Sequence, residues 1–182
     1  MNITSLTNEN KVFIRTLFHE MRANLTEFMN KRDFTISNPQ LFTFLTFAPA
    51  ALAIASDGVV DAHEIAALEK LSAQINVKTY VSIDLMEMIG VAPEPENVIS
   101  NEEFNLRVGS EILFLARNMP VYEPALIKAI TALLTFDMNP AKEGSMTQSF
   151  SALMDSVVAN NVSKNKDAEL AKMKVIKEKI GV

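Results

Sequence analysis

Apolar residues recur at helical spacing along most of the chain, and the longest such pattern lies near its start. Between Asn8 and about Lys31 these residues fall three or four positions apart, and they are Ile14, Leu17, Phe18, Met21, Leu25, Phe28 and Met29. This spacing places them along one side of a helix. The pattern therefore predicts one long amphipathic helix with a single buried stripe.

A second helix is predicted to begin where Asn38 supplies an N-cap and Pro39 supplies a first-turn proline. From Leu41 to Ala55 the chain has no charged residue and is apolar on nearly all sides. This stretch is shorter than the roughly 20 residues that span a bilayer. We therefore expect a fully buried core helix there, and no transmembrane segment.

A third helix is predicted from Asp61 to about Asn76, after a short loop. Residues 77–90 are ambiguous between helix and strand, because Val81, Ile83 and Leu85 alternate with other residues as they would in a strand. We favour a short helix, since no second strand is available to satisfy the backbone groups of a first one.

The second half of the chain carries further helix signals. They are a capping box at Ser100 and Glu103, Pro120 as a stop, Pro124 as a first-turn proline, a capping box at Ser145 and Gln148, and Gly181 as a stop. The last helix, from about Asn165 to Ile180, has Leu170, Met173, Val175, Ile176 and Ile180 near one side. Its lysines predict a basic, solvated outer face and a peripheral position.

These segments predict an all-α fold, a single-domain bundle of about eight helices over residues 1–182. The Pro- and Glu-rich stretch 91–99 is the best candidate for a connector. It leaves open a division into two similar halves, residues 1–90 and 100–182. The connector is too short to separate independent domains.

Composition narrows the classes of function. The net charge is −5 and no basic stripe is present, so we expect no nucleic-acid partner. The chain has no cysteine, which excludes disulfides, thiolate metal ligands and thiol nucleophiles. The first ten residues do not read as a signal peptide, and we therefore expect a cytoplasmic protein. A peripheral membrane contact stays open.

One segment carries candidate chemistry, the acidic turn Asp57-Gly58-Val59-Val60-Asp61-Ala62-His63-Glu64. Its Asp, Gly and terminal Glu match the second half of a calcium loop, but the first two ligand positions of that loop are alanines here. Asp57, Asp61 and Glu64 are the candidate ligands of a weakly held divalent cation. Helix capping by Asp61 and Glu64, after a turn at Gly58, explains the same residues without a metal.

The A-x-D-G-x5-E pattern at Ala55, Asp57, Gly58 and Glu64 resembles the acidic turn of the tellurite-resistance TerB-like helical proteins. The resemblance implies an all-helical fold of two similar halves, a link to stress responses and membrane-linked complexes, and acidic turns proposed to hold metal ions. Residue by residue, it covers only Asp57, Gly58, Asp61 and Glu64. A second turn at 135–140 departs from the pattern, because Met138 stands where glycine is expected.

The chain has no G-x-S-x-G, no phosphate-binding glycine loop and no H-E-x-x-H motif. We therefore expect a non-enzymatic binding or scaffolding module similar to TerB, with an unidentified protein partner. The alternative is a helical protein that binds a small apolar ligand or lipid in its Phe- and Met-rich core. An enzyme ranks third.

Overall fold

The computed structural model describes residues 8–54, 62–63, 66, 94–135, 145, 147–148, 151–152, 154–155 and 166–182. Within these residues the fold is all-α and contains no strand. Its helices are α1 (Asn8–Arg32), α2 (Asn38–Ile54), α6 (Asn101–Arg117), α7 (Met119–Leu134) and α9 (Lys166–Ile180). The expected all-α class is confirmed for this part of the chain. The third helix, residues 77–90, the count of about eight and the two halves lie wholly or partly outside it and stay predictions.

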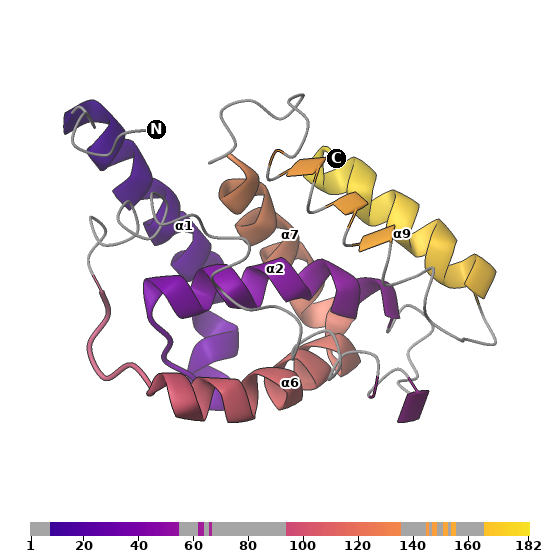
Figure 1. Ribbon diagram of the computed structural model, residues 1–182, viewed down its shortest axis with the longest axis horizontal. Helices are drawn as coiled ribbons and strands as arrows, with labels where there is room; N and C mark the ends of the chain where they lie inside the picture. Colours follow the sequence, from indigo (N-terminus) through magenta and orange to yellow (C-terminus); the bar gives the residue numbers. More distant parts are fainter. Residues whose placement is uncertain are drawn as a thin grey trace.

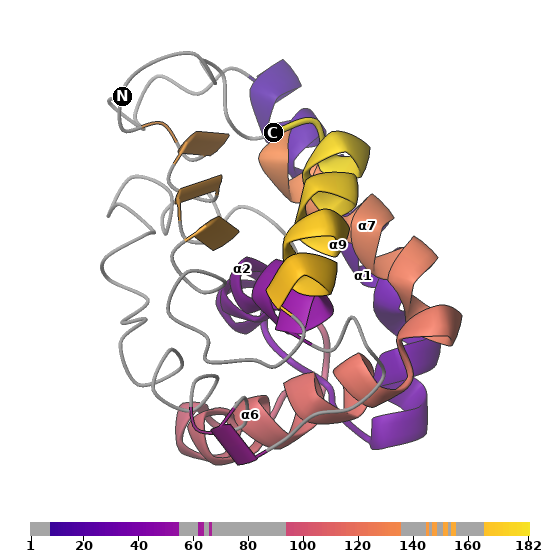
Figure 2. The same ribbon diagram turned by 90° about the vertical axis from the view of Figure 1, so that its right-hand side faces the viewer.

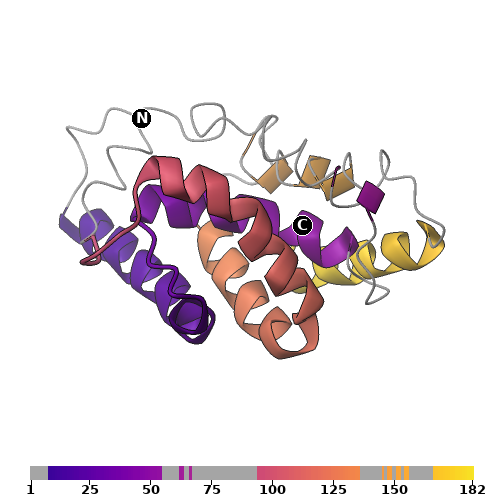
Figure 3. The same cartoon turned by 90° about the horizontal axis from the view of Figure 1, so that it is seen from below.

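Three helices form a layer in which α7 lies between α1 and α9 (Figure 1), and the view from below shows the same order (Figure 3). Helix α2 crosses one face of this layer and contacts α6, α7 and α9. Helix α6 lies along one edge, below α2 and α9 in Figure 2. The opposite face of α7 is therefore not covered by α2.

The core lies where α1, α2, α6 and α7 meet, and it is rich in aromatic rings. Phe28 of α1 packs against Phe44 of α2, with ring centroids 5.7 Å apart, and edge-on against Tyr122 of α7 at 5.4 Å. Phe34 stacks on Phe104 of α6 at 6.1 Å. The apolar stripe predicted on α1 is confirmed from Leu17 to Phe28, because Leu17, Phe18, Met21, Leu25 and Phe28 are all buried. Met29 is half-buried, and the side chain of Ile14 lies outside the described residues.

Helix α2 confirms its expected burial over the residues whose side chains are described. Leu41, Phe42, Phe44, Leu45 and Ala48 are all at most 2% exposed. An apolar surface on all sides suits this position, because α2 is covered by α6, α7 and α9. No helix in the described part of the chain is both long and apolar enough to cross a membrane.

The cap of α2 differs from the expectation. Ser37, not Asn38, caps the helix, because its hydroxyl oxygen accepts a hydrogen bond from the Gln40 N–H at 3.2 Å. The Gln40 side chain accepts one in return from the Ser37 N–H at 2.8 Å, which completes a capping box. Asn38 is fully buried, and its side-chain oxygen accepts two hydrogen bonds from Arg22 of α1, at 3.0 and 2.7 Å.

The connector is bound to the corner between α1 and α2. The Glu94 carboxylate accepts a hydrogen bond from the Asn38 N–H at 2.8 Å and lies 3.9 Å from the Arg22 guanidinium. The Ile99 N–H donates to the carbonyl of Thr35 at 2.9 Å. Residues 94–99 therefore tie the start of α6 to the first two helices.

The start of α6 agrees with the predicted cap, whereas the start of α7 differs from the prediction. One of the two hydrogen bonds of the predicted capping box is present: the Ser100 hydroxyl oxygen accepts from the Glu103 N–H at 3.0 Å. The prediction that Pro124 opens α7 is wrong. The helix has already begun, because the Asn118 carbonyl accepts from the Val121 N–H at 3.1 Å, and Pro120 takes the first-turn position. Pro124 lies inside α7 and is exposed.

Helix α9 ends at Gly181 as expected. This glycine has φ +80°, and its N–H donates to the Lys177 carbonyl at 2.9 Å. The buried stripe is narrower than expected, because Leu170 is 49% and Val175 42% exposed, while Met173, Ile176 and Ile180 are buried. Val175 lies two positions from Met173, which places it almost on the opposite side of the helix.

Candidate functional site

The acidic turn lies outside the described residues, and so do its candidate ligands Asp57, Asp61 and Glu64. Of the following helix, the structure describes Ala62, His63 and Ala66 as helical and exposed. Among the described residues, no three His, Asp or Glu side chains are grouped as a metal ion would need. Capping and cation binding at this turn both stay predictions.

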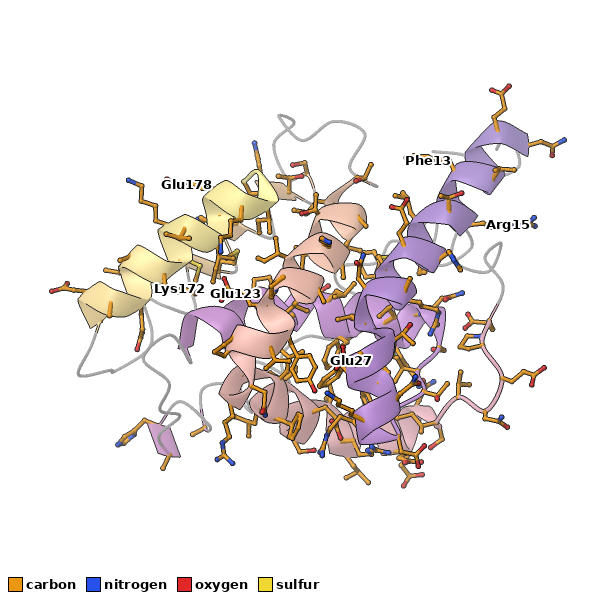
Figure 4. The ribbon with its side chains drawn as sticks, turned by 180° about the vertical axis from the view of Figure 1, so that it is seen from behind. Phe13, Arg15, Glu27, Glu123, Lys172 and Glu178 are labelled. Atoms are coloured by element: carbon orange, nitrogen blue, oxygen red, sulfur yellow. The ribbon has the colours of Figure 1, made fainter. Side chains whose placement is uncertain are left out.

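A groove runs along the uncovered face of α7, and we call it the α7 groove. It consists of two adjoining depressions of about 500 and 470 Å³, which share Ile127, Lys128 and Lys179. The first is completed by Glu20, Asn24, Thr131, Ala132 and Thr135, and the second by Pro120, Glu123 and Pro124. Its walls are α1 on one side and α9 on the other, and Figure 4 shows α7 between them.

The sequence of α7 explains the open floor. The outward positions Pro120, Pro124, Lys128, Thr131 and Thr135 recur three or four residues apart, and all five are exposed. Four of them are short side chains that do not reach the tops of the neighbouring helices. The inward positions, which include Leu126, Ile130 and Leu133, are fully buried. The helix therefore packs inward with bulky residues and leaves a low strip outside.

The α9 wall is held by one carboxylate between two lysines. Glu123 accepts hydrogen bonds from Lys172 at 2.6 Å and from Lys179 at 3.0 Å, and Figure 4 shows Glu123 next to Lys172. Partial burial acts to raise the pKa of Glu123, but the hydrogen bonds and positive charges of the two lysines outweigh it and lower that pKa. Glu123 is therefore a stable anion at neutral pH.

Two other clusters of polar side chains hold helices together, one around Glu111 and one around Arg22. Glu111 of α6 is buried and accepts from the Arg32 guanidinium through both oxygens, at 2.7 and 3.2 Å, while Arg107 donates to it at 3.3 Å. Arg32 also lies over the Phe114 ring, 4.1 Å from its centroid. These contacts fix the end of α1 on α6. Their groups are engaged with one another, so they do not form a binding site.

The second cluster surrounds Arg22 of α1, and burial changes the pKa of this residue. Desolvation lowers the pKa of the Arg22 guanidinium, and the charge of Glu94 acts in the opposite direction. Arginine remains protonated at neutral pH even so. Arg22 uses its donors on Asn38 and on the Ile36 carbonyl at 2.7 Å, which makes it a structural residue of the α1–α2 corner.

The α7 groove combines apolar and charged positions. It presents an apolar strip at Pro120, Pro124 and Ile127, two ammonium groups at Lys128 and Lys179, and a carboxylate at Glu20. The residues that line this groove are not predictable from local sequence patterns, because they come from three helices that are far apart in the chain. A usable signal was the recurrence of short or polar residues at helical spacing on α7, between positions that the core requires to be apolar.

Comparison with known proteins found no match: no family model, no curated protein and no solved structure is significantly similar to this chain.

Proposed function

We propose that this protein is a non-enzymatic helical binding or scaffolding module of the TerB-like kind, and that a segment of a protein partner docks in the α7 groove. The stress-related role that the TerB resemblance implies belongs to the same proposal. The observation that carries it is the groove itself, an open strip with apolar and charged positions on a closely packed helical support. Helix faces of this kind bind partner segments through apolar anchors flanked by charges.

The packing of the core supports a binding role for the surface. The aromatic rings of α1, α2, α6 and α7 contact one another at 5.4 to 6.5 Å between centroids, so side chains of these four helices pack directly against one another in the core. The alternative, an apolar ligand or lipid inside the Phe- and Met-rich core, stays a prediction and has no supporting observation in this region. A rigid support favours binding because little ordering is required when the partner docks.

A photo-crosslinking experiment tests the groove. Benzoylphenylalanine is placed at Thr131, on the floor of the groove, or at the control position Ser110 of α6. Both are exposed helix hydroxyls that donate to a backbone carbonyl, at 2.9 and 2.8 Å, so the two replacements disturb the fold similarly. After irradiation in native host cells, we expect a discrete protein adduct from position 131 only. Equal adducts from both positions, or none from position 131, would contradict the proposal.

The acidic turn is the second part of the proposal, with Asp57, Asp61 and Glu64 as ligands of a divalent cation. Because the first two positions of a calcium loop are alanines here, we expect dissociation constants of roughly 10⁻⁴ to 10⁻³ M. Calorimetry with Ca²⁺, Mg²⁺ and Zn²⁺ measures this, with Asp57→Asn as the variant that weakens binding. Submicromolar affinity abolished by that substitution would show a built metal site and contradict the capping explanation.

A further inference from the structure

The walls of the α7 groove carry opposite charges. Glu20 lies on the α1 side, whereas Lys128 lies on α7 and Lys179 on the α9 side. Lys179 shares the single carboxylate of Glu123 with Lys172, so the α9 side keeps a net positive charge. Within the described part of the chain, no ion pair involves the side chain of Glu20 or that of Lys128. These two charges therefore depend on water or on an occupant of the groove.

Three other polar side chains in the same depression already donate a hydrogen bond to the backbone. The Thr131 hydroxyl donates to the Ile127 carbonyl at 2.9 Å, and the Thr135 hydroxyl donates to the Thr131 carbonyl at 2.9 Å. The Asn24 amide donates to the Glu20 carbonyl at 2.9 Å. An apolar surface can cover the two threonine hydroxyls without leaving a donor unpaired, because each hydroxyl has a single donor. Covering Glu20 and Lys128 without opposite charges would instead be costly.

The shape of the groove matches a helix. Its floor extends along α7 from Pro120 to Thr135, which corresponds to ~22 Å at the α-helical rise per residue. The groove is bounded on both sides by helices, as in other sites where an amphipathic helix lies between two neighbours. A helix of about 15 residues would fill this length with its apolar side over Pro120, Pro124 and Ile127.

We infer that the α7 groove binds an amphipathic helix of a partner protein with acidic residues along one edge and basic residues along the other. The acidic edge lies over Lys128 and the basic edge faces Glu20. This inference rests on the proposed function and adds the chemistry of the partner. Such a helix satisfies both lone charges at once, whereas a uniformly acidic or basic helix leaves one of them opposite a like charge.

Three designed helical peptides test this pattern. They share one leucine stripe and differ in their edges: one is acidic on one edge and basic on the other, one is acidic on both, and one is basic on both. Fluorescence anisotropy measures their affinities for the full chain. We expect the mixed peptide to bind about tenfold more tightly than either of the others, since it makes one more exposed ion pair and avoids one repulsion. A general attraction to this acidic chain would favour the basic peptide instead.

Charge reversal gives the specific prediction. Glu20→Lys makes both sides basic, so the preference should shift to the acidic peptide. Lys128→Glu makes the α1 side and the floor acidic, and the preference should shift to the basic peptide. Equal affinities for the three peptides, or variants that leave the ranking unchanged, would overturn the inference about charge.

A groove-filling variant separates this inference from the proposed function. Thr131→Trp should abolish peptide binding, and the matched variant Ser110→Trp should not. If Thr131→Trp abolishes binding but the ranking is flat, the groove binds helices and only the charge pattern is wrong. If binding is absent or survives Thr131→Trp, both the inference and the groove-based function fail. A concentration-dependent dimer that Thr131→Trp disrupts would identify the occupant as a second copy and also overturn the inference.

Discussion

Replacing Glu123 with glutamine tests how α9 is held on α7. The substitution preserves the shape of the side chain but removes the charge that binds Lys172 and Lys179, at 2.6 and 3.0 Å. Glu123 is 14% exposed, Lys172 26% and Lys179 49%. The Glu123–Lys172 pair is therefore less exposed to solvent than the Glu123–Lys179 pair, and solvent screens the latter more strongly. We therefore expect Glu123→Gln to lower the free energy of unfolding by about 1.5 kcal/mol at pH 7.

The loss should depend on pH in a defined direction. Because the pKa of Glu123 is lower in the folded protein than its usual value, the folded state binds this proton more weakly than the unfolded state. The stabilisation is therefore fully present above the unfolded pKa of about 4.3 and is lost as the pH falls through the folded pKa. Below that point the wild type carries a neutral glutamic acid, and it should be nearly as stable as the glutamine variant.

Urea denaturation followed by circular dichroism measures this difference between pH 7 and pH 3. Glu103→Gln is the control, because Glu103 is 47% exposed and, among the residues that the structure describes, its ion pair is with Arg107 of its own helix, at 3.1 Å. We expect that variant to lose at most about 0.5 kcal/mol. The reasoning would be refuted if both variants lost the same free energy at pH 7, or if the effect of Glu123→Gln persisted undiminished at pH 3.

Three further changes test the fold. Glu111→Ala should lower the free energy of unfolding by about 3 kcal/mol. A double-mutant cycle with Arg32→Ala should show a coupling energy of about 1 to 2 kcal/mol, and additive losses would mean that the ion pair contributes little to stability. Phe44→Ala should also cost about 3 kcal/mol in urea titrations, and unchanged stability would place Phe44 outside the core. Ser37→Ala should cost about 1 kcal/mol, whereas no loss would argue against the capping box with Gln40.

The candidate site was less predictable than the fold. From the sequence, the candidate site is predicted at the turn with Asp57, Asp61 and Glu64, because local spacing is informative there. The α7 groove depends on Glu20 and Lys128, which are more than 100 positions apart in the chain. Exposed charges at such a distance leave no periodic signal, because their proximity results from the packing of α1 against α7.

The extent of the described helices followed largely from the chain itself, because hydrophobic spacing and capping residues act over a few positions. Where two residues close in sequence are equally suitable as an N-cap or as a first-turn proline, the tertiary structure decided which of them takes that position. Ser37 and Asn38 are both good N-caps, and Arg22 selects Ser37 by binding the Asn38 side chain. Pro120 and Pro124 both suit a first turn, and the hydrogen bonds at Asn118 select Pro120. Such choices depend on partners distant in sequence or on how one helix follows another, and residue type and spacing do not encode them.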